Sequence, residues 1–284
     1  MMQSSSSIVS HAARIVTLNW LSVAAVATVT IMLLLALFGP MLAPFDPYAT
    51  DLGHVLLPPG PTHWFGTDQL GRDVLSRVIV SARLDLFIAV CAVTASFTIG
   101  VSIGGLSGYL GGAFDLWTSR IAEMLQVFPL FVLAMALVAA LGNDLRNVIL
   151  ATAIVNLPFY VRLARVEIGV LSSQLFVEAA RVAGNGDGRI IARVLLPNVM
   201  PNLMIQLSVN LGWAILNAAS LSFIGLGIRP PTAEWGIMVA DGAAQAMAGN
   251  WWLVVFPGAA LALAVFAFNL LGDALRDILD VRSR

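Results

Sequence analysis

Long runs of apolar residues, separated by short polar segments, dominate this chain. A helix rises about 1.5 Å per residue, so about 20 apolar residues are needed to cross the roughly 30 Å of hydrocarbon in a bilayer. Six runs reach or approach this length, although the fourth is short and contains Asn156 and Pro158. We therefore predict an all-α membrane protein with six spans, at residues 20–43, 85–110, 118–141, 147–163, 200–225 and 252–272.

The composition agrees with this class of protein. Hydrophobic residues make up 59% of the 284 positions and charged residues 11%, and the mean hydropathy is +0.89. These values are typical of membrane proteins. The first run could be a cleaved signal peptide, but its roughly 24 apolar residues exceed the 7 to 15 of a signal sequence. We interpret it as an uncleaved span.

Arginine predicts the orientation, because cytoplasmic loops retain more positive residues than translocated loops. All 15 basic residues are arginine. With the N-terminus inside, ten of them fall on the cytoplasmic side, and both termini are cytoplasmic. We divide the chain into residues 1–82 (tail, first span and outer loop) and a core of five spans at 83–284, with a cytoplasmic loop at 164–198.

Glycines recur at four-residue spacing along the second span, at Gly100, Gly104, Gly108 and Gly112. This spacing places them on one helical face, where another backbone can approach closely. The pattern predicts a packing seam between helices.

Five arginines lie between Arg162 and Arg193. In the bilayer core each would cost roughly 2.5 to 3.5 kcal/mol, so we predict a cytoplasmic loop of about 35 residues. The loop carries helical signals, with Ser172 or Ser173 as N-cap and Gly184 as a left-handed stop. A second helical piece is expected at Arg189–Leu196, and Pro197 is expected to open the fifth span.

The same loop carries a spaced motif. Glu178-Ala179-Ala180, three residues, Gly184, nine residues and Val194-Leu195-Leu196-Pro197 resemble the cytoplasmic signature loop of importer-type ABC transporter permeases. Valine replaces the family's isoleucine at position 194. Residues 65–83 and 221–242 are similar to the second permease of the dipeptide, oligopeptide and nickel importers.

The resemblance implies that this loop contacts a partner ATPase and transmits its movement to the spans. The positions that would do so are Glu178, Ala179, Ala180, Arg181, Gly184 and Pro197. The alternative is an amphipathic helix that contacts only lipid headgroups. The implied partners are a second permease, two ATP-binding cassette subunits that hold ATP and Mg, and an extracytoplasmic substrate-binding protein. The implied location is the bacterial inner membrane, and the implied cargo is a di- or oligopeptide or a related small solute.

Several functions are disfavoured by the residues themselves. A phosphate-binding loop needs a lysine, and this chain has none, so it is not its own ATPase. A net charge of −1 gives no reason to expect a nucleic-acid partner, and one cysteine, Cys91, forms no intrachain disulfide. The three histidines lie far apart and away from carboxylate clusters, so we expect no catalytic or metal site and no cofactor bound by this chain.

Two other classes of membrane protein would place reactive or ionisable side chains at membrane depth. An intramembrane protease would need a serine and a histidine, or two aspartates, at membrane depth, and the predicted spans offer neither pair. A self-sufficient carrier or channel predicts ionisable residues along its path. The predicted spans are nearly free of them, and we interpret Glu123 and Asp273 as groups at span ends. The carrier remains the alternative.

Polar and amphipathic side chains share one face of the fifth span. They recur every three or four residues, at Gln206, Asn210, Trp213, Asn217 and Ser220. We predict that this face lines a neutral translocation path; the alternative is a hydrogen-bonded seam with the second permease. On the outer side, Asp68, Arg72 and Asp73 match the family's Thr-Asp-x-x-Gly-Arg-Asp stretch. They are expected to form an ion-pair network, either for a binding protein or purely structural.

Overall fold

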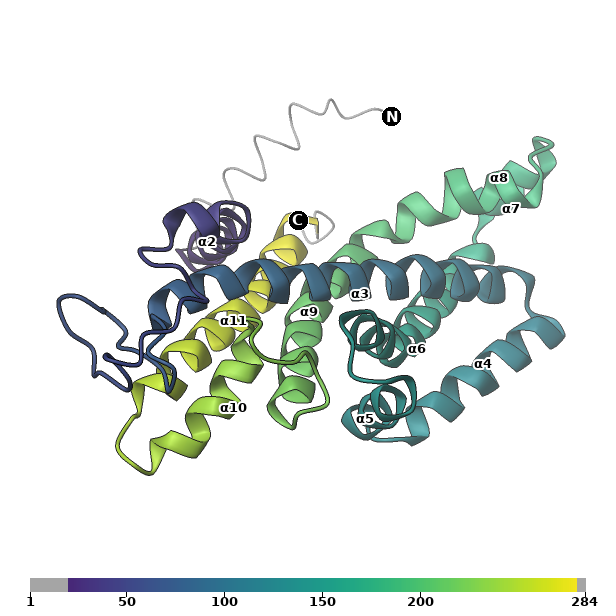
Figure 1. Cartoon of the computed structure of the whole chain (residues 1–284). Coiled ribbons are helices and arrows are strands. Elements are labelled where there is room, and N and C mark those ends of the chain that lie inside the picture. The colour runs from purple at the N-terminus through teal and green to yellow at the C-terminus, as the bar shows by residue number, and fades with distance from the viewer. Residues whose placement is uncertain (1–19, 280–284) are drawn as a thin grey trace.

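The computed structural model describes residues 20–279, which fold as helices joined by turns and by one longer segment, 43–73 (Figure 1). Within this part of the chain the β-type pairing is limited to an isolated bridge between Thr67 and Asp73. The elements in chain order are α2 (Trp20–Leu42), α3 (Val74–Leu110), α4 (Gly112–Val127), α5 (Leu130–Leu141), α6 (Leu145–Ser172), α7 (Leu175–Val182), α8 (Asp187–Ile190), the π-helical turn η1 (Ile191–Leu195), α9 (Leu196–Phe223), α10 (Trp235–Ala246) and α11 (Trp252–Leu279).

Five helices are long and apolar enough to cross a membrane. They are α2, α3, α6, the continuous stretch Asp187–Phe223 and α11, and a sixth crossing results if α4 and α5 are taken as one bent span. The predicted all-helical membrane fold is therefore confirmed for residues 20–279. The expected cytoplasmic tails, with Arg14, Arg282 and Arg284, lie outside the described residues.

The third predicted span, 118–141, is not one straight helix. The chain breaks after Val127, and α5 continues at 91° to α4. Pro129 explains the break, because its ring keeps the preceding residue out of the helical region. Phe128 accordingly has φ −79° and ψ 139°. Hydropathy is continuous across this point, so the apolar pattern alone did not reveal the bend.

The glycine seam joins α3 to α6. A Cβ atom at Gly104 would collide with the carbonyl group of Val161, and one at Gly108 with that of Arg165. Gly100 makes a similar approach one turn earlier. Because residue numbers rise together along both helices, α3 and α6 run parallel, and the bent pair α4–α5 carries the chain back between them.

Gly112 does not belong to this seam, contrary to the prediction. Gly111 ends α3 and Gly112 starts α4, with φ +64° and +61°. A Cβ atom at either position would meet no neighbour within 4 Å. These two glycines serve the sharp turn between the helices, since positive φ is unfavourable for other residues.

The entry to the fifth span is one continuous helix from Asp187 to Phe223, not two pieces. Pro197 cannot donate a hydrogen bond, and in a regular helix its ring would clash with a carbonyl one turn earlier. The helix widens just before it, where Leu196 N–H bonds to the carbonyl oxygen of Ile191 in the π-helical turn. A single π-helical turn of this kind can occur inside an α-helix, and here it accommodates Pro197 without ending the helix.

The two ends of the molecule differ in character. Figure 1 shows α7 and α8 at one end and the segment 43–73 with α10 at the other, and α3 extends between them. We call these the α7 end and the α10 end. The largest buried apolar cluster contains residues of α3, α6, α7, α9 and α11 together with Trp235. The two ends are therefore connected through one packed core.

Candidate functional site

The signature residues Glu178 to Arg181 lie on the short helix α7. Its end is a Schellman motif: Gly184 has φ +82°, its N–H donates to the carbonyl oxygen of Arg181 (2.9 Å), and Asn185 N–H donates to that of Ala180 (3.2 Å). The left-handed stop predicted at Gly184 is confirmed. Pro197 does not lie on α7. It lies ten residues beyond the start of the next helix, directly after the π-helical turn and Leu196.

The predicted start of this helix is wrong. Ser172 ends α6 and Ser173 caps its C-terminus, and their hydroxyls donate to the carbonyl oxygens of Gly169 (2.8 Å) and Val170 (3.0 Å). Gln174 occupies the N-cap position of α7 without a side-chain hydrogen bond. A serine hydroxyl can hydrogen-bond to backbone groups at the start or at the end of a helix. The two serines therefore did not show whether they mark the end of α6 or the start of α7.

The arginine-rich loop is also shorter than predicted, because α6 continues to Ser172. Arg162 and Arg165 therefore lie on α6. Arg165 contacts Asp115 of α4 through two nitrogens, and Nη2 lies 2.6 Å from Oδ2. Its charge is matched by a carboxylate on a neighbouring helix, which the sequence spacing did not indicate.

Apolar side chains project from α7 at the end of the bundle. Val177 is fully buried and anchors the helix in the main core. Leu175 and Val182 are 82% and 90% exposed, and Phe176 is also exposed. Exposed apolar groups of this size mark a surface for another protein or for a membrane.

The predicted path residues do not share one environment. Gln206 Nε2 donates to Asn210 Oδ1 (3.0 Å), and Asn210 is only 4% exposed, beside the buried Tyr160 of α6. Asn210 thus faces the interior of this chain's own bundle. Trp213 is 51% exposed on the same helix.

Asn217 and Ser220 are half-buried toward the α10 end of α9. Ser220 contributes to a groove whose other walls come from α5, α10 and α11, and its hydroxyl donates to the carbonyl oxygen of Leu216 (2.7 Å). The face predicted from helical spacing is therefore divided between an interior contact at Gln206 and Asn210 and an accessible surface at Trp213, Asn217 and Ser220.

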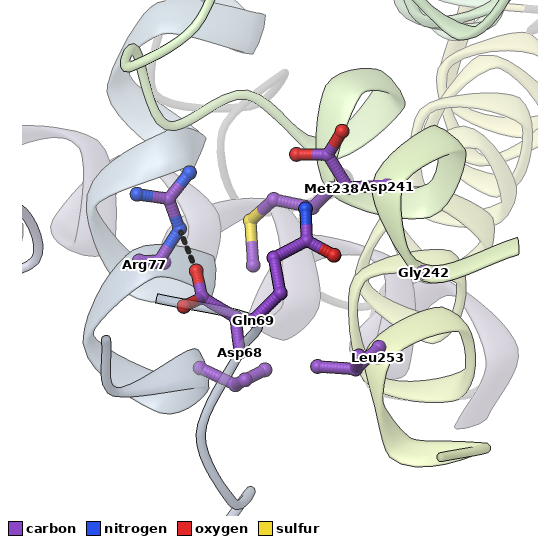
Figure 2. Close-up of a pocket in the computed structure, with 8 residues that line it drawn as sticks. Asp68, Gln69, Arg77, Met238, Asp241, Gly242 and Leu253 are labelled. Carbon is purple, nitrogen blue, oxygen red and sulfur yellow. Dashed lines mark ion pairs between the residues drawn. The ribbon is translucent and has the colours of Figure 1, made fainter. Parts of the chain in front are cut away.

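Asp68, Arg72 and Asp73, predicted to lie on the outer side, take part in two separate contacts. Arg72 Nε lies 2.6 Å from Asp68 Oδ2, and Arg77 Nε lies 3.6 Å from the same oxygen. Figure 2 shows Arg77 directed at Asp68 across a small pocket that Asp241 of α10 also lines. Burial raises the pKa of Asp241. Arg77, which sequence reasoning did not include, is 2% exposed and completes this network.

Asp73 does not join that ion pair, contrary to the expected single network. It caps α3 by accepting from Ser76 N–H (2.8 Å) and Ser76 Oγ (2.7 Å), and His63 Nδ1 lies 2.9 Å from its Oδ1. His54 likewise lies 2.7 Å from Asp51. Each of these two histidines thus pairs with a single aspartate rather than with a cluster of carboxylates, while His11 lies outside the described residues.

A second buried acidic contact was missed. Asp85 of α3 is 1% exposed and accepts from Trp235 N–H (3.2 Å). Glu234, fully buried, caps α10 by accepting from Gly236 and Ile237 N–H, and burial raises the pKa of its carboxyl. No short motif links residues 150 positions apart, so only the polarity of Asp85 beside an apolar run could have signalled it.

Glu123 and Asp273, predicted to lie at span ends, are accessible positions on α4 and α11. Glu123 pairs with Arg120 at 3.2 Å, and both side chains are 63% exposed. Asp273 is exposed on α11. Asp85 is a buried ionisable group that bears on a carrier mechanism, and it accepts a hydrogen bond from the first turn of α10.

Comparisons with known proteins agree with this architecture. Residues 100–284 match the family described as "Binding-protein-dependent transport system inner membrane component", and residues 11–59 match the "N-terminal TM domain of oligopeptide transport permease C". The chain is 45% identical over 263 residues to a probable D,D-dipeptide transport system permease protein of Escherichia coli K12, covering 93% of this chain and 88% of that protein.

Two further relatives have similar coverage. The dipeptide transport system permease protein DppC of Alkalihalophilus pseudofirmus is 39% identical over 94% of this chain and 87% of its own length. The nickel transport system permease protein NikC of Escherichia coli K12 is 39% identical over 92% of this chain and 94% of its own length. The chain therefore belongs to the family of binding-protein-dependent transport system inner membrane components, and it is a multi-pass membrane permease.

Proposed function

We propose that this chain is one permease subunit of an ATP-driven importer in the bacterial inner membrane, and that α7 is the segment through which partner ATPases act on it. The observation that carries the proposal is the α7 end itself. There, a helix stopped by Gly184 presents Leu175 and Val182 outside the bundle, at 82% and 90% exposure. A docked partner would cover these apolar groups.

The charge distribution supports a cytoplasmic location for this end. Arg181, Arg189 and Arg193 gather around it, and positive residues favour the cytoplasmic side. Segment 43–73 joins α2 to α3, and α11 starts just after α10, so the N-terminal end of α2 and the C-terminal end of α11 would then face the cytoplasm. The segment 43–73 and α10 would face the delivering protein.

The mechanism we propose is mechanical. The partner subunits would bind ATP and Mg, and their closure would displace α7 and switch the spans between outward-open and inward-open states. Trp213, Asn217 and Ser220 would line the path, and Gln206 with Asn210 would hold α9 against α6. Small peptides are the proposed cargo, since permeases named for dipeptide transport are among the relatives.

The test is affinity purification of the chain from its native membrane in mild detergent, followed by mass spectrometry and uptake assays in proteoliposomes. We expect recovery of a second permease and two ATPases, and uptake that requires ATP and a binding protein. A chain that is recovered alone and moves solute without ATP would refute the proposal in favour of a self-sufficient carrier.

A matched pair of variants tests α7 within that assay. Gly184→Val places a β-branched residue at φ +82°, whereas Gly186→Val changes a glycine with φ −72° that also has no neighbour within 4 Å. We expect ATP-driven uptake to be lost in the first variant and retained in the second. Equal uptake in both would refute the role of this helix end.

A further inference from the structure

One side chain at the α7 end touches two segments that are separated in sequence. Tyr109, in the last turn of α3, donates its hydroxyl to Asp187 Oδ1 at 2.6 Å. The guanidinium carbon of Arg181 lies over the same ring, 5.3 Å from its centroid. Tyr109 therefore contacts α7 through its ring and the start of the helix leading into α9 through its hydroxyl.

Both contacts are directional. A hydrogen bond to a carboxylate is shorter and stronger than one between neutral groups, and 2.6 Å is within that range. A guanidinium over an aromatic face is attracted by the ring quadrupole within about 6 Å of the centroid. A displacement of Arg181 or Asp187 would therefore act on the tyrosine itself rather than on the surrounding solvent.

The covalent connection after α7 is a weak mechanical link. Gly184, Gly186 and Gly188 fall within five residues, and a Cβ atom at any of them would meet no neighbour within 4 Å. Glycine also has the widest backbone freedom of any residue. Movement of α7 along this turn would be absorbed by backbone rotation, so a direct side-chain contact between α7 and a long helix provides a stiffer route.

The helix that bears Tyr109 is suited to carry movement. α3 has 37 residues, about 55 Å at 1.5 Å per residue, and its sequence contains no proline. Near its inner end Ser107 Oγ donates to Asp115 Oδ1 (2.6 Å), which ties it to α4. Near its outer end the carbonyl oxygen of Val78 accepts from Trp235 Nε1 (3.0 Å), which ties it to α10.

We propose that Tyr109 is a positioning residue that transmits the displacement of α7 into α3, and through α3 to α10 at the opposite end. The proposal rests on the proposed function of α7 as the segment on which the ATPases act. It adds to that function a specific contact, outside the signature motif, on which the yield of transport per ATP depends.

The experiment uses the assembled complex in proteoliposomes and measures solute imported per ATP hydrolysed. Tyr109→Leu removes both contacts, and Tyr109→Phe removes the hydrogen bond and keeps the ring. We expect the ratio to fall about tenfold in the first variant and about threefold in the second, magnitudes ordinary for losing such contacts. Thr98→Val, at an exposed residue of α3 whose hydroxyl donates to the carbonyl oxygen of Thr94 in the same helix (2.8 Å), is the control and should leave the ratio unchanged.

Asp187 variants test whether the hydrogen bond itself is responsible. Asp187→Asn keeps an acceptor oxygen and should retain most of the wild-type ratio, whereas Asp187→Ala should match Tyr109→Phe. The double variant Tyr109→Phe with Asp187→Ala should be no worse than either single variant, because both remove the same bond. Additive losses in the double variant would overturn the proposal, and this comparison stands even if Tyr109→Leu does not assemble.

The outcomes separate this inference from the function on which it rests. ATP-driven uptake with an unchanged ratio in Tyr109→Leu would overturn the inference alone. A parallel loss of assembly and uptake, with the ratio unchanged in the complexes that do form, would also overturn it, because it would assign Tyr109 a purely structural role. Wild-type uptake that is independent of ATP would overturn the proposed function instead.

Discussion

Asp115 of α4 and Arg165 of α6 form a two-point ion pair at the α7 end, with Arg165 Nη2 lying 2.6 Å from Asp115 Oδ2. Ser107 of α3 donates to the same carboxylate. Three helices therefore converge on one acidic side chain directly beside the sharp turn at Gly111 and Gly112. The bent return through α4 and α5 is fixed at this point.

Asp115→Asn should weaken this junction, because the amide cannot match the charge of the guanidinium. We expect a loss of about 1 to 2 kcal/mol of stability. Glu123→Gln, in a pair that is 63% exposed on both sides, is the control and should change stability by less than about 0.5 kcal/mol. Thermal unfolding of the purified chain in detergent measures both, and equal shifts would contradict the assignment.

Gly104→Ala should destabilise the fold, because its Cβ atom would collide with the carbonyl group of Val161 and force α3 away from α6. Overpacking of this kind costs about 1 to 3 kcal/mol. Gly188→Ala adds the same methyl group where no neighbour lies within 4 Å. A melting temperature that is lowered only in Gly104→Ala is the expected result; an unchanged value there would show that the seam has room to adjust.

Asp68→Ala should be among the most damaging changes at the α10 end. It removes the carboxylate shared by Arg72 and Arg77, which are 4% and 2% exposed. Leaving buried charges without a partner costs about 3 to 5 kcal/mol. We expect little folded protein in size-exclusion chromatography of this variant and normal yield for Asp277→Asn, an exposed position on α11. Normal yield of both would indicate that water compensates the arginines.

Two asparagines of α9 should differ in the kind of defect that their replacement causes. Asn217→Leu alters the accessible part of the face, so we expect impaired uptake at unchanged thermal stability. Asn210→Leu alters a side chain that is 4% exposed and bonded to Gln206, so we expect changed stability and normal uptake per folded complex. Uptake and thermal stability are measured in both variants. Impaired uptake in Asn210→Leu with normal uptake in Asn217→Leu would place the path on the other side of α9.

The apolar pattern predicted most of the helices because transfer to a bilayer depends on the composition of a segment, which the sequence states directly. The last span begins at its predicted start, Trp252. The left-handed stop at Gly184 was likewise predictable, since few other residues tolerate that conformation. Features that depend only on neighbouring residues, such as this helix stop, could be predicted from the sequence.

Features that depend on distant partners were not readable in this way. Asp85 is buried because α10, 150 residues later, presents Trp235 N–H to it. Arg77 and Asn210 are buried by packing among helices whose relative rotation no spacing specifies. The bend at Pro129 was different in kind: its cause is local, but a hydropathy average does not register backbone geometry.

The length of α3 has a consequence for the lipid that surrounds the protein. From the exposed Arg83 to Tyr109 the helix rises about 39 Å, close to the 40 to 45 Å of a bilayer with its headgroups. A thinner or thicker bilayer would change the tilt of a helix so closely matched to it. Because that tilt moves Tyr109 relative to Arg181, we expect the yield of transport per ATP to pass through a maximum as the acyl chains of the vesicle lipid are lengthened.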